Sequence, residues 1–151
     1  MLIPAIVAAH SASRYVSSGE ELIVDNAEKA LAIACRKCKA TVTDYTAAPL
    51  LSQKENIAAH EWLIEFEKCP SDIDLFTDVL DKTLQSVNSD YEAKRFRDIN
   101  LVKPVIRSVP KDTFHNWLKS KNKLGGQNKV PRLSNNREYI EELYLFEGVK
   151  P

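Results

Sequence analysis

Two periods of hydrophobic positions run through the chain, and they predict helices and strands in turn. From Asp25 to Lys39, apolar side chains recur every three or four residues, which predicts an amphipathic helix. Asp25 followed by Glu28 has the spacing of a capping box at its start. In contrast, HEWLIEFE (residues 60–67) alternates with a period of two and predicts a half-buried strand. Its buried face would hold His60, Trp62, Ile64 and Phe66, and its solvated face Glu61, Glu65 and Glu67. Leu63 interrupts the polar side, which leaves partial cover of that second face as an alternative.

The other elements follow from the same patterns. β-Branched residues predict a strand over 41–47, which Pro49 closes, and another over 104–109. Because two strands follow one another directly, a simple alternation of strands and helices is excluded. The predicted fold class is α+β, a small mixed β-sheet flanked by α-helices. Further helices are predicted over 71–88, 90–97, 112–121 and 135–145, the last capped by Asn135 and Glu138.

Composition narrows the class of protein. A chain of 151 residues with 44% hydrophobic content can form one globular domain with a core of its own. Its 21 basic and 21 acidic residues give no overall signature of a polyanion binder. The N-terminal apolar run LIPAIVAA is far shorter than the ~20 residues of a membrane-spanning helix, so no membrane partner is expected. Three cysteines without an export signal predict reduced thiols in the cytoplasm.

The basic residues are concentrated in one place. Between Lys111 and Arg132 there are six Lys and Arg residues and a single Asp, and this region contains GGQNKVPR (residues 125–132). Paired glycines let backbone N–H groups converge on an anion, and amides, Lys and Arg add donors and charge. The segment is either an anion-binding loop or a solvated basic loop. The residues that would contact an anion are Gly125, Gly126, Gln127, Lys129 and Arg132.

Other candidate sites have simpler explanations. Cys35 and Cys38 form a CxxC pair late in a helix and on its apolar face, whereas redox pairs begin a helix. We therefore interpret them as small buried hydrophobic residues. A zinc site would need four ligands, and no metal site is predicted. His60 and His115 have no nucleophile near them in the sequence and are interpreted as structural.

Several segments resemble a known family. NSDYEAKR (88–95), PVIRSVPKDTFHNWLKSK (104–121) and GGQNKVPRLSNNREYIEEL (125–143) resemble the closing part of the Gretchen-Hagen-3 family of acyl-acid amido synthetases. GEELIVDNAEKA (19–30) and DYTAAP (44–49) resemble its bacterial branch. The most specific part is the pattern Gln127–x–Lys129–x–Pro131–Arg132, preceded by Tyr91, Arg95, Thr113 and Phe114.

The resemblance implies part of an ATP-dependent acid–amino acid ligase of the adenylate-forming superfamily. In that family a carboxylic acid attacks ATP to give an acyl-adenylate and pyrophosphate, and an amino acid then forms the amide and releases AMP. A large N-terminal domain binds the acid and ATP with Mg, and a small C-terminal domain acts as a lid. Residues 19–151 are similar to that lid alone, and residues 1–18 to a remnant of the junction.

The resemblance also assigns roles and leaves alternatives. Lys129 would be the catalytic residue, and Gly125, Gly126, Gln127 and Arg132 would join it in binding ATP. The alternative for Gln127 is that it holds the loop, and the alternative for Arg132 is a structural role. The family usually has glycine where this chain has Asp112. Because the N-terminal nucleotide motifs are absent, the isolated chain is expected to be inactive. The alternatives are a non-catalytic remnant or an anion-binding module using residues 111–132. A nucleic-acid partner is not expected, because only Phe114 and Trp117 could stack on bases and both are expected to be buried.

Overall fold

The computed structural model describes residues 22–52, 57–98, 100–121 and 130–146. The order of its elements and its mixed sheet confirm the predicted α+β class. The elements are α2 (Val24–Cys38), β1 (Thr41–Ser52), β2 (Ile57–Lys68), α3 (Ile73–Val87), α4 (Ser89–Arg95), a short 3-10 helix η1 (Phe96–Asp98), β3 (Val105–Val109), α5 (Thr113–Ser120) and α6 (Glu138–Leu145).

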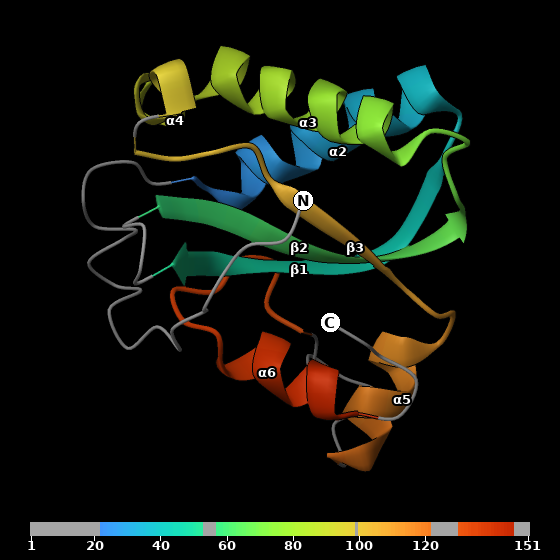
Figure 1. Ribbon diagram of the computed structural model, residues 1–151. Helices are drawn as coiled ribbons and strands as arrows, with labels where there is room; N and C mark the ends of the chain where they lie inside the picture. Colours follow the sequence, from blue (N-terminus) through green and yellow to red (C-terminus); the bar gives the residue numbers. More distant parts are fainter. Residues whose placement is uncertain (1–21, 53–56, 99, 122–129, 147–151) are drawn as a thin grey trace.

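The three strands are ordered β1-β2-β3, with β2 antiparallel to β1 and parallel to β3. The parallel pairing requires a crossover, which α3 and α4 provide between β2 and β3. Figure 1 shows α2, α3 and α4 on one face of the sheet and α5 and α6 on the other. The molecule therefore has three layers, and the sheet is the middle one.

Strand β2 contributes side chains to a core on each side of the sheet. Trp62, Ile64 and Phe66 lie in the first core, between the sheet and helices α2 and α3. Leu63 points the other way, into the second core, where it packs with Phe114 and Trp117 of α5. The alternation of β2 is therefore that of a central strand covered on both faces.

The predicted solvated face of β2 is wrong for two of its three glutamates. Glu61 and Glu65 are buried beneath α5 and α6, and only Glu67 is exposed. Burial of these carboxylates is tolerated because each has strong hydrogen-bond donors nearby, which the sequence pattern does not reveal. A polar alternation thus indicated a strand correctly but misjudged which of its faces is exposed.

Strand β1 continues well beyond its predicted end. It runs to Ser52, and Pro49 lies inside it, opposite His60 of β2. Proline lacks an N–H, so it is tolerated on an edge strand where no ladder bond is needed, and β1 is at the edge of the three-stranded order. The prediction that Pro49 ends the strand is therefore wrong.

The predicted helix starts are displaced by one to three residues. Helix α2 begins after Ile23, whose N–H donates to Asn26 Oδ1 over 3.2 Å, so the predicted Asp25–Glu28 box is not its cap. Before α6, it is Asn136 and not Asn135 whose side chain accepts from the Glu138 N–H, at 2.9 Å. Before α6, two adjacent asparagines compete for the same role, and their spacing alone does not choose between them.

Asp112, which precedes α5, has a left-handed backbone with φ 67° and ψ 9°. This conformation costs a non-glycine residue about 1–2 kcal/mol, less for Asp than for most. We expect Asp112→Gly to raise the free energy of unfolding by about 0.5–1 kcal/mol in urea titrations, since the strain is removed. Asp112→Ala is the matched control and should be less stable than the glycine variant. Equal stability of the Gly and Ala variants would contradict the prediction.

Candidate functional site

Four of the five predicted anion-binding residues lie outside the part of the chain that the structure describes. Gly125, Gly126, Gln127 and Lys129 belong to residues 122–129, whereas Arg132 is described. The described residues on either side of 122–129 are Lys121, which caps the end of α5, and residues 130–134, which we call the return segment.

The return segment lies along the outer edge of β1. The Ala47 N–H donates to the Arg132 carbonyl and the Ser134 N–H to the Ala47 carbonyl, both over 2.9 Å, which makes a parallel bridge between Ala47 and Leu133. Thr46 Oγ1 donates to the Pro131 carbonyl at 2.6 Å. Val130 is buried in the second core. The return segment thus extends the sheet by a short stretch on the far side of β1.

The Arg132 side chain already has partners. Its guanidinium forms an ion pair with Asp44 and lies over the ring of Tyr45, 4.9 Å from the ring centroid. The side chains of Arg132 and Asp44 are 30% and 23% exposed. Tyr45 Oη donates to Glu28 of α2 over 2.6 Å, and burial together with this carboxylate raises the pKa of Tyr45. No sequence pattern indicated Asp44 and Tyr45 as partners of Arg132, although both lie in the family-like segment DYTAAP.

A shallow hollow of about 320 Å³ lies beside this arrangement, between α2 and β1. Its polar rim includes Glu28, Thr41, Thr43 and Arg132, and its wall includes Leu31 and Cys35. The only described cation among the lining residues is Arg132, and Asp44 balances its charge. This hollow has no surplus positive charge with which to hold a triphosphate.

On the other flank of residues 122–129, α5 is fixed at both of its ends. The buried Glu65 accepts the backbone N–H groups of Asp112 at 3.1 Å and Phe114 at 3.2 Å, so a strand residue caps the helix. At the far end, Lys121 forms an ion pair with Glu142 of α6 at 2.6 Å. Trp117 and Tyr139 stack edge to face, with 5.7 Å between ring centroids. Helix α5 is therefore held by both the sheet and α6.

A buried charged network joins the sheet to α6. Glu61 Oε1 accepts from Arg137 at 2.8 Å, and Glu61 Oε2 accepts from Arg107 at 2.8 Å and from the Tyr144 hydroxyl. Burial raises the pKa of Glu61, but the hydrogen bonds from Tyr144, Arg107 and Arg137 outweigh it, so this pKa lies below its ordinary value. Arg137 also donates to the Pro49 carbonyl at 3.0 Å. Each side chain in this network therefore has a structural role.

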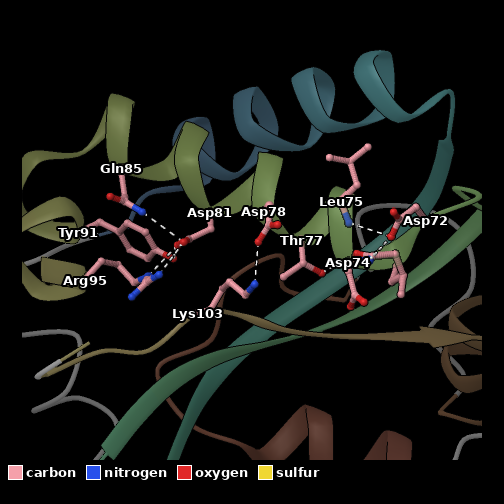
Figure 2. A network of polar contacts seen from close by, with 11 residues as sticks. Asp72, Asp74, Leu75, Thr77, Asp78, Asp81, Gln85, Tyr91, Arg95 and Lys103 are labelled. Atoms are coloured by element: carbon pink, nitrogen blue, oxygen red, sulfur yellow. Dashed lines mark hydrogen bonds and ion pairs between the residues drawn. The ribbon is translucent and has the colours of Figure 1, made fainter. Parts of the chain in front are cut away.

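A second network explains the family-like residues Tyr91 and Arg95. Figure 2 shows Asp81 of α3 at its centre. Asp81 accepts from Tyr91 Oη at 2.7 Å, from Arg95 Nε at 2.8 Å and from Arg95 Nη2 at 2.7 Å. Arg95 Nη1 donates to the Leu101 carbonyl at 3.1 Å, which also fixes the chain leading to β3. These residues hold α4 on α3 and are not directed at a ligand.

The cysteines and the potential metal ligands form no reactive or metal-binding cluster in the described part of the chain. Cys35 and Cys38 pack at the margin of the first core, where both are half-buried and not buried as predicted, and Cys69 is exposed; none of the three forms a disulfide. No cluster of three or more potential metal ligands is found among the residues that the structure describes. Within the same residues, no helix has the length and apolar character to cross a bilayer.

His60 is a structural histidine. It stacks on Tyr91, with 5.6 Å between ring centroids. Burial lowers the pKa of His60 to about 4; Asp81 raises it and Lys94 lowers it further. The imidazole is therefore neutral at physiological pH, as a core residue requires.

Comparison with known proteins gives the family. The model of the "GH3 family C-terminal domain" matches residues 25–138. No curated protein matches the chain. Among solved structures, a "GH3.15 acyl acid amido synthetase" shares the fold with a TM-score of 0.60 and 19% identity, over 80% of this chain and 23% of that one. The "AtGH3.15 acyl acid amido synthetase in complex with 2,4-DB" gives 0.61 and 18% over the same shares.

The chain thus spans about a quarter of the length of those synthetases. The TM-scores of 0.60 and 0.61 demonstrate a common fold; because the identities are below 20%, these structures show the fold alone, and the family match carries the assignment. That match covers α2 to the start of α6 and includes the Gln127–Arg132 pattern. The chain belongs to the GH3 family and corresponds to its C-terminal domain.

Proposed function

We propose that this chain is the lid domain of an ATP-dependent acid–amino acid ligase, which forms an acyl-adenylate and then an amide. The observation that carries the proposal is the family match over residues 25–138, which contains the Gln127–Arg132 pattern. Similar folds occur in proteins named acyl acid amido synthetases. The substrates would be a carboxylic acid and an amino acid. The three unpaired cysteines suit the reducing cytoplasm, where we place the reaction.

Lys129 is the proposed catalytic residue. Adenylation builds negative charge on the α-phosphate and on the departing pyrophosphate, and a lysine brought to these oxygens would stabilise that charge. A lysine on a mobile lid could then withdraw before the amine attacks. Gly125, Gly126 and Gln127 are proposed to supply N–H donors to the same phosphates.

ATP and Mg²⁺ would be held mainly by an N-terminal adenylation domain. The described residues contain no cluster of carboxylates for a cation, and their hollow beside Arg132 has no surplus positive charge. The start of α2 supports such a neighbour, because Ile23 and Val24 are 49% and 44% exposed next to the proposed junction. Adjacent exposed apolar side chains at a domain junction are suited to packing against a second domain.

The test is ATP–pyrophosphate exchange with the ligase in which this domain is joined to its N-terminal domain. We expect Lys129→Ala to slow exchange about 100-fold, since it removes one charged contact to the transition state. Lys119→Ala is the matched control, because Lys119 is exposed on α5 within the same basic region, and it should leave the rate unchanged. The isolated chain should show no exchange with any acid.

Two results would count against the proposal. An unchanged rate in Lys129→Ala would indicate a lid that takes no part in adenylation, as in a non-catalytic remnant. Exchange by the isolated chain would show that a complete active site lies within it.

No observation favours the anion- or nucleic-acid-binding alternative. Of the basic residues between 111 and 132 that are described, Lys121 and Arg132 are already in ion pairs. Phe114 and Trp117 are 1% and 3% exposed, as predicted, so neither offers a stacking surface to a base.

A further inference from the structure

We propose that Arg132 is a positioning residue of the ligase, which fixes the return segment to β1, and that it is not a phosphate contact. The inference rests on the proposed function, because it assigns a role to a residue within the Gln127–Arg132 pattern. Its structural part, the attachment of residues 130–134 to β1, stands on the contacts of the described residues alone.

The first ground is that the charge of Arg132 is balanced within the domain. Asp44 faces the guanidinium, and Asp44 Oδ1 also accepts the Tyr45 N–H at 2.9 Å, which fixes the carboxylate. Tyr45 lies beneath the guanidinium and is itself held by Glu28. Arginine is well suited to such a site because its planar group both pairs with a carboxylate and stacks on an aromatic ring.

The second ground is the negative charge that would be left on the domain if Arg132 turned towards a nucleotide. Asp44, whose side chain is 23% exposed, would lose its cation. Glu28 accepts the hydrogen bond of the Tyr45 hydroxyl and lines the same hollow as Arg132, so the site would then carry two carboxylates facing an incoming triphosphate. Like charges in a partly buried site repel strongly. A phosphate contact by Arg132 would therefore weaken both the domain and the binding of ATP.

The third ground is the position of these contacts in the chain. The backbone of Pro131, Arg132 and Ser134 is bonded to Thr46 and Ala47, directly beside Asp44 and Tyr45. The side-chain and backbone contacts of the return segment thus fall on four consecutive residues of β1. Lys129 immediately precedes the return segment in the sequence. Arg132 and Asp44 would therefore act on catalysis indirectly, by holding the return segment to the rigid sheet.

Asp44 provides the decisive variant, because the two roles predict opposite effects for it. If Arg132 positions the return segment, Asp44→Asn and Arg132→Ala should each lower kcat for pyrophosphate exchange by about tenfold while KM for ATP stays the same. If Arg132 contacts phosphate, Arg132→Ala should raise KM for ATP, and Asp44→Asn should lower it by releasing the guanidinium. The second pattern would overturn the inference.

A charge-reversed pair tests the attachment more directly. Arg132→Asp alone should lower kcat at least as much as Arg132→Ala, and adding Asp44→Arg should recover a several-fold part of the loss. A phosphate-binding arginine would not be restored by a guanidinium placed on β1. Absence of any recovery would count against the proposal.

Amide hydrogen exchange on the purified chain separates this inference from the proposed function. In Asp44→Asn and Arg132→Ala, the Ala47 and Ser134 amides should exchange about tenfold faster, because they form the bridge to the return segment. The Ile64 amide of β2 should be unchanged. Faster amide exchange, together with an unchanged pyrophosphate-exchange rate for Lys129→Ala in the joined ligase, would refute the proposed function and keep the attachment. Unchanged Ala47 and Ser134 amides would refute the attachment whatever the activity of the joined ligase.

Discussion

Replacing Arg137 by methionine is expected to lower the free energy of unfolding by about 3–5 kcal/mol. Arg137 and Glu61 are each 1% exposed in their side chains, and their atoms Nη2 and Oε1 are 2.8 Å apart. Removing Arg137 leaves the buried Glu61 carboxylate with only Arg107 and the Tyr144 hydroxyl as partners, and breaking a buried ion pair is one of the costliest single changes in a protein. Methionine keeps most of the volume, so the loss reports the charge and the bond to the Pro49 carbonyl.

The control for this prediction is a pair of similar geometry at the surface. Lys121 and Glu142 also attach α6, at 2.6 Å, but their side chains are 35% and 36% exposed. Lys121→Met should therefore cost less than about 1 kcal/mol. Replacing both buried partners, as Glu61→Leu with Arg137→Met, should cost less than the two single changes added together. Urea denaturation measures all four variants, and equal losses for Arg137→Met and Lys121→Met would refute the prediction.

Lowering the pH from 7.5 to 4 is expected to remove about 3 kcal/mol of stability through His60 alone, of which about 2 kcal/mol is lost by pH 5. The pKa of His60 is about 4 in the folded protein, against an ordinary value of 6.5. Below pH 6.5 the unfolded chain binds a proton that the folded protein does not accept until about pH 4. Stability due to the neutral imidazole is therefore complete above pH 6.5 and falls as the pH is lowered.

The variant His60→Gln isolates this effect. The difference in unfolding free energy between the wild type and the variant should shrink by about 2 kcal/mol from pH 7.5 to pH 5, because only the wild type loses the histidine contribution. Glu61 also has a lowered pKa, but its contribution is lost only as the pH falls through a value below 4.5. His115→Gln, at an exposed position, should follow the wild type. Parallel curves for wild type and His60→Gln would contradict the assignment.

The elements of this fold could be predicted because each has a strong local period. The apolar face of α2 and the alternation of β2 are properties of neighbouring residues, and both were identified correctly. The exposure of Glu61 and Glu65 was mispredicted because their partners lie far away in the sequence. Arg137 is 76 residues from Glu61, and Phe114 is 49 residues from Glu65. No local pattern signals that a carboxylate will meet a helix start or a buried guanidinium.

The candidate site also has a local part that the sequence predicts and a long-range part that it does not. The pattern Gln127–x–Lys129–x–Pro131–Arg132 and the anion chemistry of its residue types are visible in the sequence. The partner of Arg132 is not, since Asp44 is 88 residues away and is one of many aspartates. Pairing across such a separation is set by the packing of the return segment on β1, and so is decided by tertiary structure.

The two tryptophans of the chain lie on opposite sides of the sheet, Trp62 in the first core and Trp117 in the second. Each is almost fully buried, so its fluorescence will shift when its own core is exposed to water. Single-tryptophan versions made with Trp62→Phe or Trp117→Phe therefore give each layer its own optical reporter. Coincident denaturation curves would mean that both layers melt in one cooperative step, and separate curves would mean that one layer can open while the other stays folded.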